Sequence, residues 1–330
     1  MISRLWRTIR LTSAVALACC GTATTNQALA QASRVFPSKP VHIIVPFSAG
    51  GPVDVAARAL GQHLRGPLNQ TILIENRPGA GTIIGTDAVA KSTPDGHTWL
   101  LTSSGISINP SVYKKLPYDT LKDIAPVTLL LTTPWALIVN NDLPVKSVSE
   151  FVSYAKKNPG KLFYSSSGSA NQLTSELFNS QTDIKTMHSP YKGSAESLTA
   201  VVTGEVAYQF GNANNALRLA RAGKVRILGV SSARRDSNMP DIPAIAESGV
   251  PGFESIVWFG VFAAGGTPMP IQQRIHGEIA KVASIDEVKK ILSTVGSEIV
   301  AEGPQKFAPL FRAEVSMWAR VAREAGIQPE

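Results

Sequence analysis

Short apolar runs alternate with longer segments of helical periodicity along most of this chain. Residues 41–45 form a mostly apolar run, and residues 54–64 then repeat apolar side chains at helical spacing. The same two patterns follow one another at 71–75, 82–91 and 98–102. Such alternation is typical of α/β proteins, in which helices connect and cover the strands of a sheet. We therefore predict an α/β fold.

The alternation continues to the end of the sequence without an internal repeat or a low-complexity segment. Further strands are predicted at 127–131, 136–139, 161–165, 207–210, 225–230 and 258–263. Further helices are predicted at 148–157, 172–181, 194–203, 216–222, 270–284, 286–294 and 304–325.

The first thirty residues have the composition of a signal peptide. Three arginines precede the apolar segment 11–20, which is too short for a membrane span of about 20 residues. Ala28-Leu29-Ala30 then supplies the small-x-small pattern that signal peptidase accepts. An anchor helix is the alternative, and Cys19 and Cys20 leave a lipoprotein as a second one. We predict cleavage near Ala30 and a periplasmic location.

Removal of this leader changes the chemistry of the chain. Both cysteines are lost with it, so the mature protein has neither disulfides nor thiol chemistry. The net charge of +8 falls to +5 once the three leader arginines are removed. The remaining basic residues are scattered, whereas nucleic-acid-binding proteins gather them in a patch. A small anion is therefore a better expected ligand than a polyanion.

A mature chain of about 300 residues is long enough for two domains. No Pro/Gly-rich linker divides it, so we expect the chain to cross between the domains twice. The crossings are predicted near Thr132-Thr133-Pro134 and Val250-Pro251-Gly252. This gives a discontinuous first domain at 31–133 and 252–330 and a second domain at 134–251.

The turn that joins the first strand to the first helix contains Gly50 and Gly51. Glycines leave backbone N–H groups uncovered, and a helix N-terminus favours an anion. An ordinary tight turn capped by Asp54 is the alternative. Three later strand ends are also rich in small, hydroxyl or amide residues, at 101–107, 164–171 and 209–215. Because ligands bind beyond the carboxyl ends of strands in open α/β sheets, these loops are predicted to converge on one small anion.

Signatures of enzymes are absent from the sequence. It has no Gly-x-Ser-x-Gly elbow and no Walker A loop, and residues 79–85 only approximate a dinucleotide fingerprint. No histidine has a partner at metal-ligand spacing. The histidines are His42, His63, His97, His188 and His276.

Short motifs, in a fixed order along nearly the whole mature chain, resemble those of a known protein family. They are Pro37-Ser38-Lys39-Pro40, Val45 to Asp54, Glu75 to Gly81, Pro94-Asp95-Gly96, Asn109-Pro110, Leu116 to Asp119, Tyr164 to Gly168, Pro190 to Ser194, Ala222-Gly223-Lys224, Trp258-Phe259-Gly260 and Thr267-Pro268. With these motifs the chain resembles the Bug family of extracytoplasmic solute receptors, the binding subunits of tripartite tricarboxylate transporters.

The resemblance implies a two-domain periplasmic-binding-protein fold, a type II-like Venus flytrap with a mixed sheet in each domain. It implies a small carboxylate as ligand, held by backbone amides, hydroxyls and waters, and transporter permease subunits as partners. We expect no catalytic residue, no cofactor, no metal, no nucleic acid and a monomer. The implied ligand-binding residues are Phe47, Ser48, Ala49, Gly50, Gly51, Ser103, Ser104, Ser166, Ser167, Gly168 and Asn171, with Gly211 and Asn212 from the fourth loop.

Three further residues have expected roles. Asp54 is assigned mainly to capping, and Tyr191 and Trp258 are expected either as pocket walls or as core packing. Many members of the family carry an acidic residue where this chain has Gly211. We therefore predict a ligand without an ammonium group: a dicarboxylate, a hydroxy acid or an aromatic acid. An exported α/β enzyme and a sensor for a membrane kinase remain the alternative functions.

Overall fold

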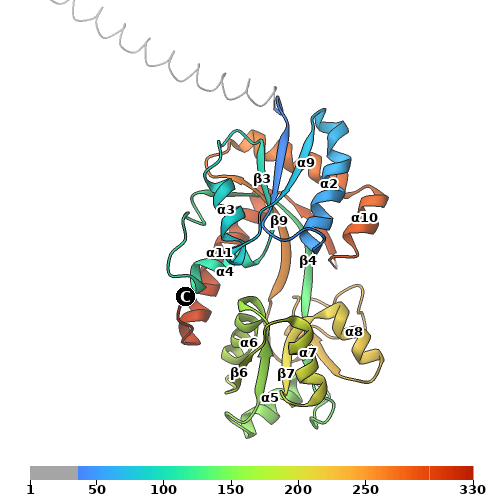
Figure 1. Ribbon diagram of the computed structural model, residues 1–330. Helices are drawn as coiled ribbons and strands as arrows, with labels where there is room; N and C mark the ends of the chain where they lie inside the picture. Colours follow the sequence, from blue (N-terminus) through green and yellow to red (C-terminus); the bar gives the residue numbers. More distant parts are fainter. Residues whose placement is uncertain (1–35, 297, 330) are drawn as a thin grey trace, which may run out of the picture.

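The computed structural model describes residues 36–296 and 298–329, and the expected signal peptide lies outside them. The molecule has two lobes, one above the other in Figure 1, joined by the long strands β4 (Ile124–Val139) and β9 (Ile256–Ala264). The described chain begins in the upper lobe, its middle part forms the lower lobe, and its C-terminal end lies beside the junction. The predicted two-domain α/β fold is confirmed.

The elements follow one another in the predicted alternation. The other strands are β1 (Val41–Val45), β2 (Ile72–Asn76), β3 (Thr98–Ser103), β5 (Phe163–Ser166), β6 (Met187–Pro190), β7 (Tyr208–Asn212), β8 (Arg226–Val230) and β10 (Glu298–Glu302). The helices are α2 (Pro52–Leu68), α3 (Ile83–Ala90), α4 (Gly105–Val112), α5 (Val148–Lys157), α6 (Ser169–Thr182), α7 (Ser194–Thr203), α8 (Ala213–Arg221), α9 (Met269–Ala283), α10 (Asp286–Leu292) and α11 (Pro304–Glu324), with short 3₁₀ turns η1 (Ala80–Thr82) and η2 (Ala246–Ser248).

Hydrogen-bonded neighbours follow one another in the order β2-β1-β3-β9-β4-β7-β5-β6. The strands β10 and β8 also pair with β4, outside this order. In the upper lobe β1 is parallel to β2 and β3, while β9 is antiparallel to β3 and β4. In the lower lobe β5 is parallel to β6 and β7, while β4 is antiparallel to β7 and β8. Each lobe therefore has a mixed sheet, as predicted.

Strand β4 belongs to both sheets. Its first part pairs with β9 as far as Pro134, and its last part, from Trp135, pairs with β7. The sequence predicted two strands interrupted at 132–134, and this prediction is wrong because the strand is continuous. Pro134 lacks a backbone N–H, but it stands where the strand changes partners, so the missing donor interrupts neither ladder.

Other differences concern short elements. The sequence predicted a loop at 101–107, but helix α4 begins within it at Gly105. The strands β6 and β10 were not predicted. Both are short, and β6 lies at the end of the sheet with partly exposed side chains, so it lacks an apolar run.

Helices cover both faces of each sheet. One core cluster in the upper lobe joins β1, β3 and β9 to α2 and α9, and another joins the opposite face to α3 and α11. In the lower lobe, aromatic residues fill the face under α5 and α6, including Phe151, Phe178 and Phe210. The other face packs against α7 and α8. The helical periodicity of the sequence is therefore explained by burial of one face of each helix.

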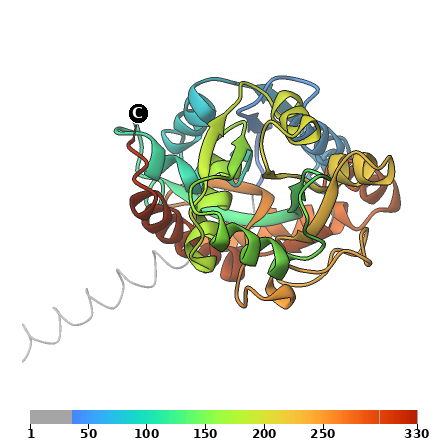
Figure 2. The ribbon, with the colours of Figure 1, turned by 90° about the horizontal axis from the view of Figure 1, so that it is seen from below.

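The C-terminal helix α11 contacts both lobes, along one side of the molecule (Figures 1 and 2). Phe307 and Phe311 pack against Trp258 in the upper lobe, with ring centroids 5.2 and 6.2 Å from it. In the C-terminal half of the same helix, Trp318 and Val321 pack in the aromatic core of the lower lobe. The helix therefore braces the junction that β4 and β9 cross.

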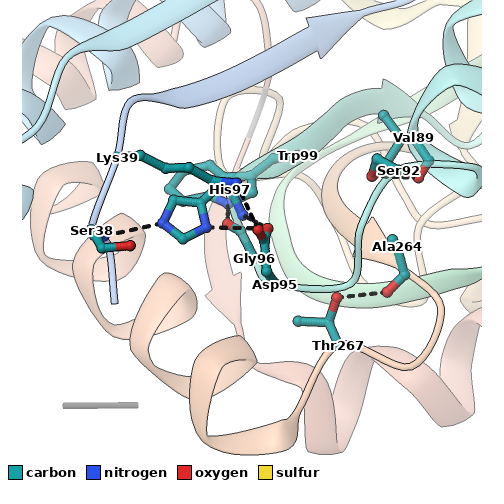
Figure 3. Close-up of polar contacts among 10 residues, drawn as sticks. All are labelled: Ser38, Lys39, Val89, Ser92, Asp95, Gly96, His97, Trp99, Ala264 and Thr267. Atoms are coloured by element: carbon teal, nitrogen blue, oxygen red, sulfur yellow. Dashed lines mark hydrogen bonds and ion pairs between the residues drawn. The ribbon is translucent and has the colours of Figure 1, made fainter. Parts of the chain in front are cut away.

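The Pro94-Asp95-Gly96 motif fastens the beginning of β3 to the segment before β1 (Figure 3). His97 Nε2 accepts the backbone N–H of Ser38 at 3.1 Å, and Asp95 pairs with Lys39 at 2.9 Å. Trp99 Nε1 donates to the Gly96 carbonyl at 2.6 Å. Although Ser38, His97 and Asp95 resemble a hydrolase triad in type, Nε2 already accepts a backbone amide. The cluster is therefore structural, and it lies at the amino ends of the strands.

Glu314 of α11 is partly buried where three elements meet. Its carboxylate accepts hydrogen bonds from Trp258 Nε1 at 2.9 Å and from Ser107 Oγ of α4 at 3.0 Å. Burial raises the pKa of this carboxyl to about 7, and the two hydrogen bonds only partly offset that effect. The folded protein therefore binds a proton here that the unfolded chain, with an ordinary pKa of 4.5, has released.

Glu314→Gln should remove this pH dependence. Because the pKa is raised on folding, the free energy of unfolding of the wild type should fall between pH 4.5 and about pH 7 and then stay low. The variant should be the more stable protein at pH 8, by about 3 kcal/mol at most, with the advantage shrinking toward pH 4.5. Urea unfolding of both proteins measures this difference. A difference that is the same at both pH values would contradict the assignment.

Candidate functional site

The strand directions bring four loops to the junction between the lobes. Trp135, the first residue of β4 in the lower sheet, pairs with Asn212 at the carboxyl end of β7, and β5 runs parallel to β7. In the upper sheet Ser103, at the carboxyl end of β3, pairs with Phe259 near the start of β9, and β1 runs parallel to β3. The carboxyl ends of both sheets therefore face the junction. Figure 1 shows the β1–α2 turn on the edge of the upper lobe that faces the lower lobe.

The glycine turn after β1 is held by Asp54. The Gly50 N–H donates to Asp54 Oδ2 at 2.8 Å, and the Gly51 N–H makes a long bond of 3.4 Å to the Ser48 carbonyl. Gly50 has a φ of +82°, which glycine adopts at little cost. Within the described chain, the N–H groups of Ser48 and Ala49 have no partner, and both residues are exposed. This turn, on the edge of the upper lobe that faces the lower one, therefore has two free donors, while the Gly50 N–H is occupied.

Asp54 is buried and accepts three hydrogen bonds. Besides Gly50, its donors are Arg58 Nε at 2.8 Å and Asn76 Nδ2 at 2.9 Å. Burial opposes ionisation, but the hydrogen bonds outweigh it and hold the pKa of this carboxyl below its usual 3.8. Asp54 caps the turn, as predicted, but it does so from the third position of α2. The N-cap residue itself is Gly51.

The β3–α4 loop lies beside the core of the upper lobe. The Ser104 N–H donates to the Trp258 carbonyl at 2.9 Å, and Ser104 is buried whereas Ser103 is partly exposed. Trp258 itself is fully buried against Phe307, so it packs the core and is not a pocket wall. Neither serine lines the two cavities of the lower lobe described next.

Two adjoining cavities lie at the β5–α6 loop and share Ser167 and Gly168. The larger, of about 400 Å³, is also lined by Ser166, and the smaller, of about 260 Å³, by Asn171. Gly168 is the N-cap of α6 and offers no side chain to the N–H groups of the first turn. Both cavities therefore open on a helix N-terminus that carries free donors.

The smaller cavity is lined by two side-chain amides, those of Gln209 and Asn171. Gln209 Oε1 accepts hydrogen bonds from Ser197 Oγ at 2.7 Å and Ser165 Oγ at 3.3 Å, so its NH₂ group is turned away from both hydroxyls. Asn171 is only 7% exposed, and its side chain has no hydrogen-bond partner among the described residues. Because Asn171 lines the cavity, its amide remains available to a ligand there.

The remaining predicted residues of this cavity differ in what they offer. Asn212 is exposed, and its side-chain oxygen accepts the Asn215 N–H at 3.1 Å, so it caps α8 as well as lining the cavity. Gly211 is buried, and a Cβ there would lie 2.7 Å from Ile138 and 3.0 Å from Gln209 Nε2. A side chain at this position would therefore displace the Gln209 amide.

Sequence reasoning missed several residues of the two cavities. Trp135 lines the smaller one, and Gln172, His188 and Tyr113 line the larger one together with the predicted Tyr191. His188 lies on the unpredicted strand β6, and its Nε2 is 2.7 Å from Ser166 Oγ. Only its proximity in the fold distinguishes it from the other histidines, so spacing along the sequence carried no signal.

Across residues 36–296 and 298–329, no group of three or more His, Cys, Asp or Glu side chains is placed to hold a metal ion. No helix in the same part of the chain has the length and hydropathy needed to cross a membrane.

The two-lobed fold, with its loops directed at the junction, defines the class of periplasmic solute-binding proteins. The chain belongs to the tripartite tricarboxylate transporter receptor family, whose profile matches residues 56–327. It is 33% identical to protein BugT of Bordetella pertussis over 308 residues, which covers 92% of this chain and 94% of BugT. Members of this family are receptors for solutes.

Two solved structures with ligands are similar to this one. A protein of R. palustris solved with adipate is 36% identical, has a TM-score of 0.71, and is matched over 89% of this chain and 100% of its own. MatC from Rhodopseudomonas palustris, solved with bound malate, is 32% identical, has a TM-score of 0.66, and is matched over 87% and 99% of the two chains.

Asp54→Asn tests the role of Asp54 in the glycine turn. Loss of the charge weakens its hydrogen bonds to Gly50 and Arg58, so the free energy of unfolding at pH 7 should fall by about 1–3 kcal/mol. Because the pKa is lowered on folding, this difference should vanish as the pH falls below 3.8. Asp286→Asn, which alters the i,i+3 pair of a fully exposed aspartate with Lys289, is the control and should leave the stability almost unchanged. Equal losses in the two variants would refute the special role of Asp54.

Proposed function

We propose that this chain is a periplasmic receptor that captures a small carboxylate between its lobes and delivers it to the permease of a tripartite tricarboxylate transporter. In this proposal the first domain comprises residues 31–133 and 252–330 and the second comprises 134–251, with cleavage of the leader near Ala30. The observation that carries the proposal is the cavity at the open N-terminus of α6, which is lined by the oriented Gln209 amide and the Asn171 amide.

The donors at this junction suit an anion of low charge. They are neutral amides, hydroxyls and backbone N–H groups, contributed by Ser48 and Ala49 of the upper lobe and by the loops at Ser167 and Asn171 of the lower lobe. A hydrogen bond to a charged group contributes about 1.5–3 kcal/mol. Four or five such bonds, less the costs of binding, reach the roughly 8 kcal/mol of a micromolar complex.

Closure of the lobes is part of the proposed mechanism. The predicted residues Phe47 to Gly51, with Ser103 and Ser104, belong to the upper lobe, whereas Ser166 to Asn171, Gly211 and Asn212 belong to the lower one. A carboxylate held by the lower loops would gain the free amides of Ser48 and Ala49 only when the lobes approach. Ligand binding would therefore favour the closed form, because that form makes more contacts with it.

The ligand is proposed to be a dicarboxylate, a hydroxy acid or an aromatic acid. The similar proteins solved with adipate and malate support the first two classes. A receptor is preferred over an enzyme because the His97–Asp95 pair contacts only the backbone of Ser38, and His188, which contacts the Ser166 hydroxyl, has Gln172 and not a carboxylate on its other nitrogen. Incubation of each bound acid with the protein, followed by chromatography, tests this preference. Loss of substrate with turnover would overturn it.

Asn171→Asp should abolish binding while leaving the fold intact. The substitution keeps the shape of the side chain but places a negative charge beside the ligand, so the dissociation constant should rise about 100-fold or more in isothermal titration calorimetry. Asn214→Asp makes the same change on α8 at an exposed residue outside the lining of the smaller cavity, and it should change affinity less than about threefold. Equal effects of the two substitutions would remove Asn171 from the site.

Ligands with an ammonium group should bind more weakly than their deaminated analogues. Gly211 provides no carboxylate to pair with an ammonium, and the donors beside it are amides. Succinate and malate should therefore stabilise the protein in a thermal-shift titration at concentrations where aspartate does not. Ligand at about 100 times its dissociation constant adds about 2.7 kcal/mol of stability. Tighter binding of aspartate than of succinate would sink this prediction.

A further inference from the structure

His188 lines the larger cavity between two polar partners that set the tautomer of its neutral ring. Its Nδ1 is 3.3 Å from Gln172 Nε2, and its Nε2 is 2.7 Å from Ser166 Oγ. An amide nitrogen only donates, so Nδ1 accepts and carries no proton. The neutral ring therefore carries its proton on Nε2 and donates it to Ser166.

This arrangement determines what Ser166 can do. Its oxygen accepts from His188, its side chain is only 2% exposed, and the cavity is the space it lines. The hydroxyl proton is then left to point toward that cavity as a donor. A serine hydroxyl can both donate and accept hydrogen bonds. The bond from His188 leaves the Ser166 hydroxyl as a donor toward the cavity, which is what an anion requires.

The surroundings of His188 hold few charges. Tyr164 of β5 stacks on the imidazole with centroids 5.0 Å apart, and Tyr208 of β7 contacts Thr186 next to it. The negative charge of the Glu176 carboxylate, on α6, favours the protonated form of the His188 ring. The same carboxylate accepts a hydrogen bond from the Tyr164 hydroxyl. Burial lowers the pKa of His188, and the negative charge of Glu176 opposes this effect only in part.

We infer that His188 is a positioning residue of the ligand cleft, which directs the Ser166 hydroxyl at the carboxylate and takes up a proton from solvent when the carboxylate binds. The inference rests on the proposed function. The proton is added at Nδ1, and the Gln172 amide rotates so that its oxygen accepts from the new N–H. Nε2 continues to donate to Ser166, so protonation adds a positive charge beside the anion without loss of a hydrogen bond. The bound anion in turn favours the charged ring, because opposite charges raise the pKa of histidine.

Two substitutions separate the two roles. His188→Gln keeps a donor for Ser166 but does not titrate, whereas His188→Leu removes both the donor and the titration. His276→Gln is the matched control, since His276 is also a partly buried histidine with a lowered pKa but lies on α9 in the upper lobe. A thermal-shift panel of succinate, malate, adipate and benzoate selects a ligand of the wild type, and calorimetry then measures its affinity between about pH 6 and about pH 8.

The wild type and His276→Gln should bind the selected acid about three- to tenfold more tightly at pH 6 than at pH 8, with proton uptake seen as a dependence of the heat on the buffer. His188→Gln should match the wild type within about threefold at pH 8 but show no pH dependence. His188→Leu should bind about tenfold more weakly at pH 8. Retention of the wild-type pH slope in His188→Gln would overturn the inference about proton uptake, and full affinity of His188→Leu at pH 8 would overturn the positioning role. If no acid of the panel binds the wild type, the proposed function itself fails.

Discussion

The architecture of this protein depends on one strand that is hydrogen-bonded in two sheets. Strand β4 pairs with β9 through Pro134 and with β7 from Trp135 onward, without a break. Because its direction is the same in both lobes, the directions of the strands around it are fixed as well. The carboxyl ends of β1 and β3 therefore face those of β5 and β7 across the junction. The place where a ligand can be held follows from backbone pairing before any side chain is considered.

The proposed function depends on neutral donors at the junction that the surrounding hydrogen bonds either orient or leave free. Asp54 occupies the Gly50 N–H, and in doing so it leaves Ser48 and Ala49 as the free donors of the first turn. Two buried hydroxyls fix the Gln209 amide in the same way. In the proposed site, such dipoles would need little rearrangement to bind an anion, and they would attract it without a buried positive charge, which would require its own counterion.

The sequence predicted the parts of the fold that are set by local pattern. The strand at 41–45 and the helices at 148–157 and 194–203 have the predicted bounds, because their periodicity and their end signals agree. The continuity of β4 through Pro134 could not be predicted, since it depends on a change of partner strand. The short strand β6 carries no apolar alternation, and it forms because β5 is already in place beside it.

For the candidate site, sequence reasoning found the loops but could not assign their donors. The residues Ser166 to Gly168 and Asn171 were named from strand-end position and resemblance, and the structure places them around two adjoining cavities. The hydrogen bond that orients Gln209 and the contact between His188 and Ser166 each join residues more than ten positions apart, so local sequence patterns do not predict them. Trp258 illustrates the opposite case, because an aromatic residue in a shared motif proved to be core packing.

Native mass spectrometry of protein purified without refolding tests the central claim most directly, because a receptor can retain its ligand through purification. The account predicts a population whose mass exceeds that of the mature chain by one small organic acid, released on collisional activation as a carboxylate anion. It further predicts that Asn171→Asp, purified in parallel, carries no such adduct. Retention of an amine, a sugar or a nucleotide in place of a carboxylate, and equally in both proteins, would contradict it.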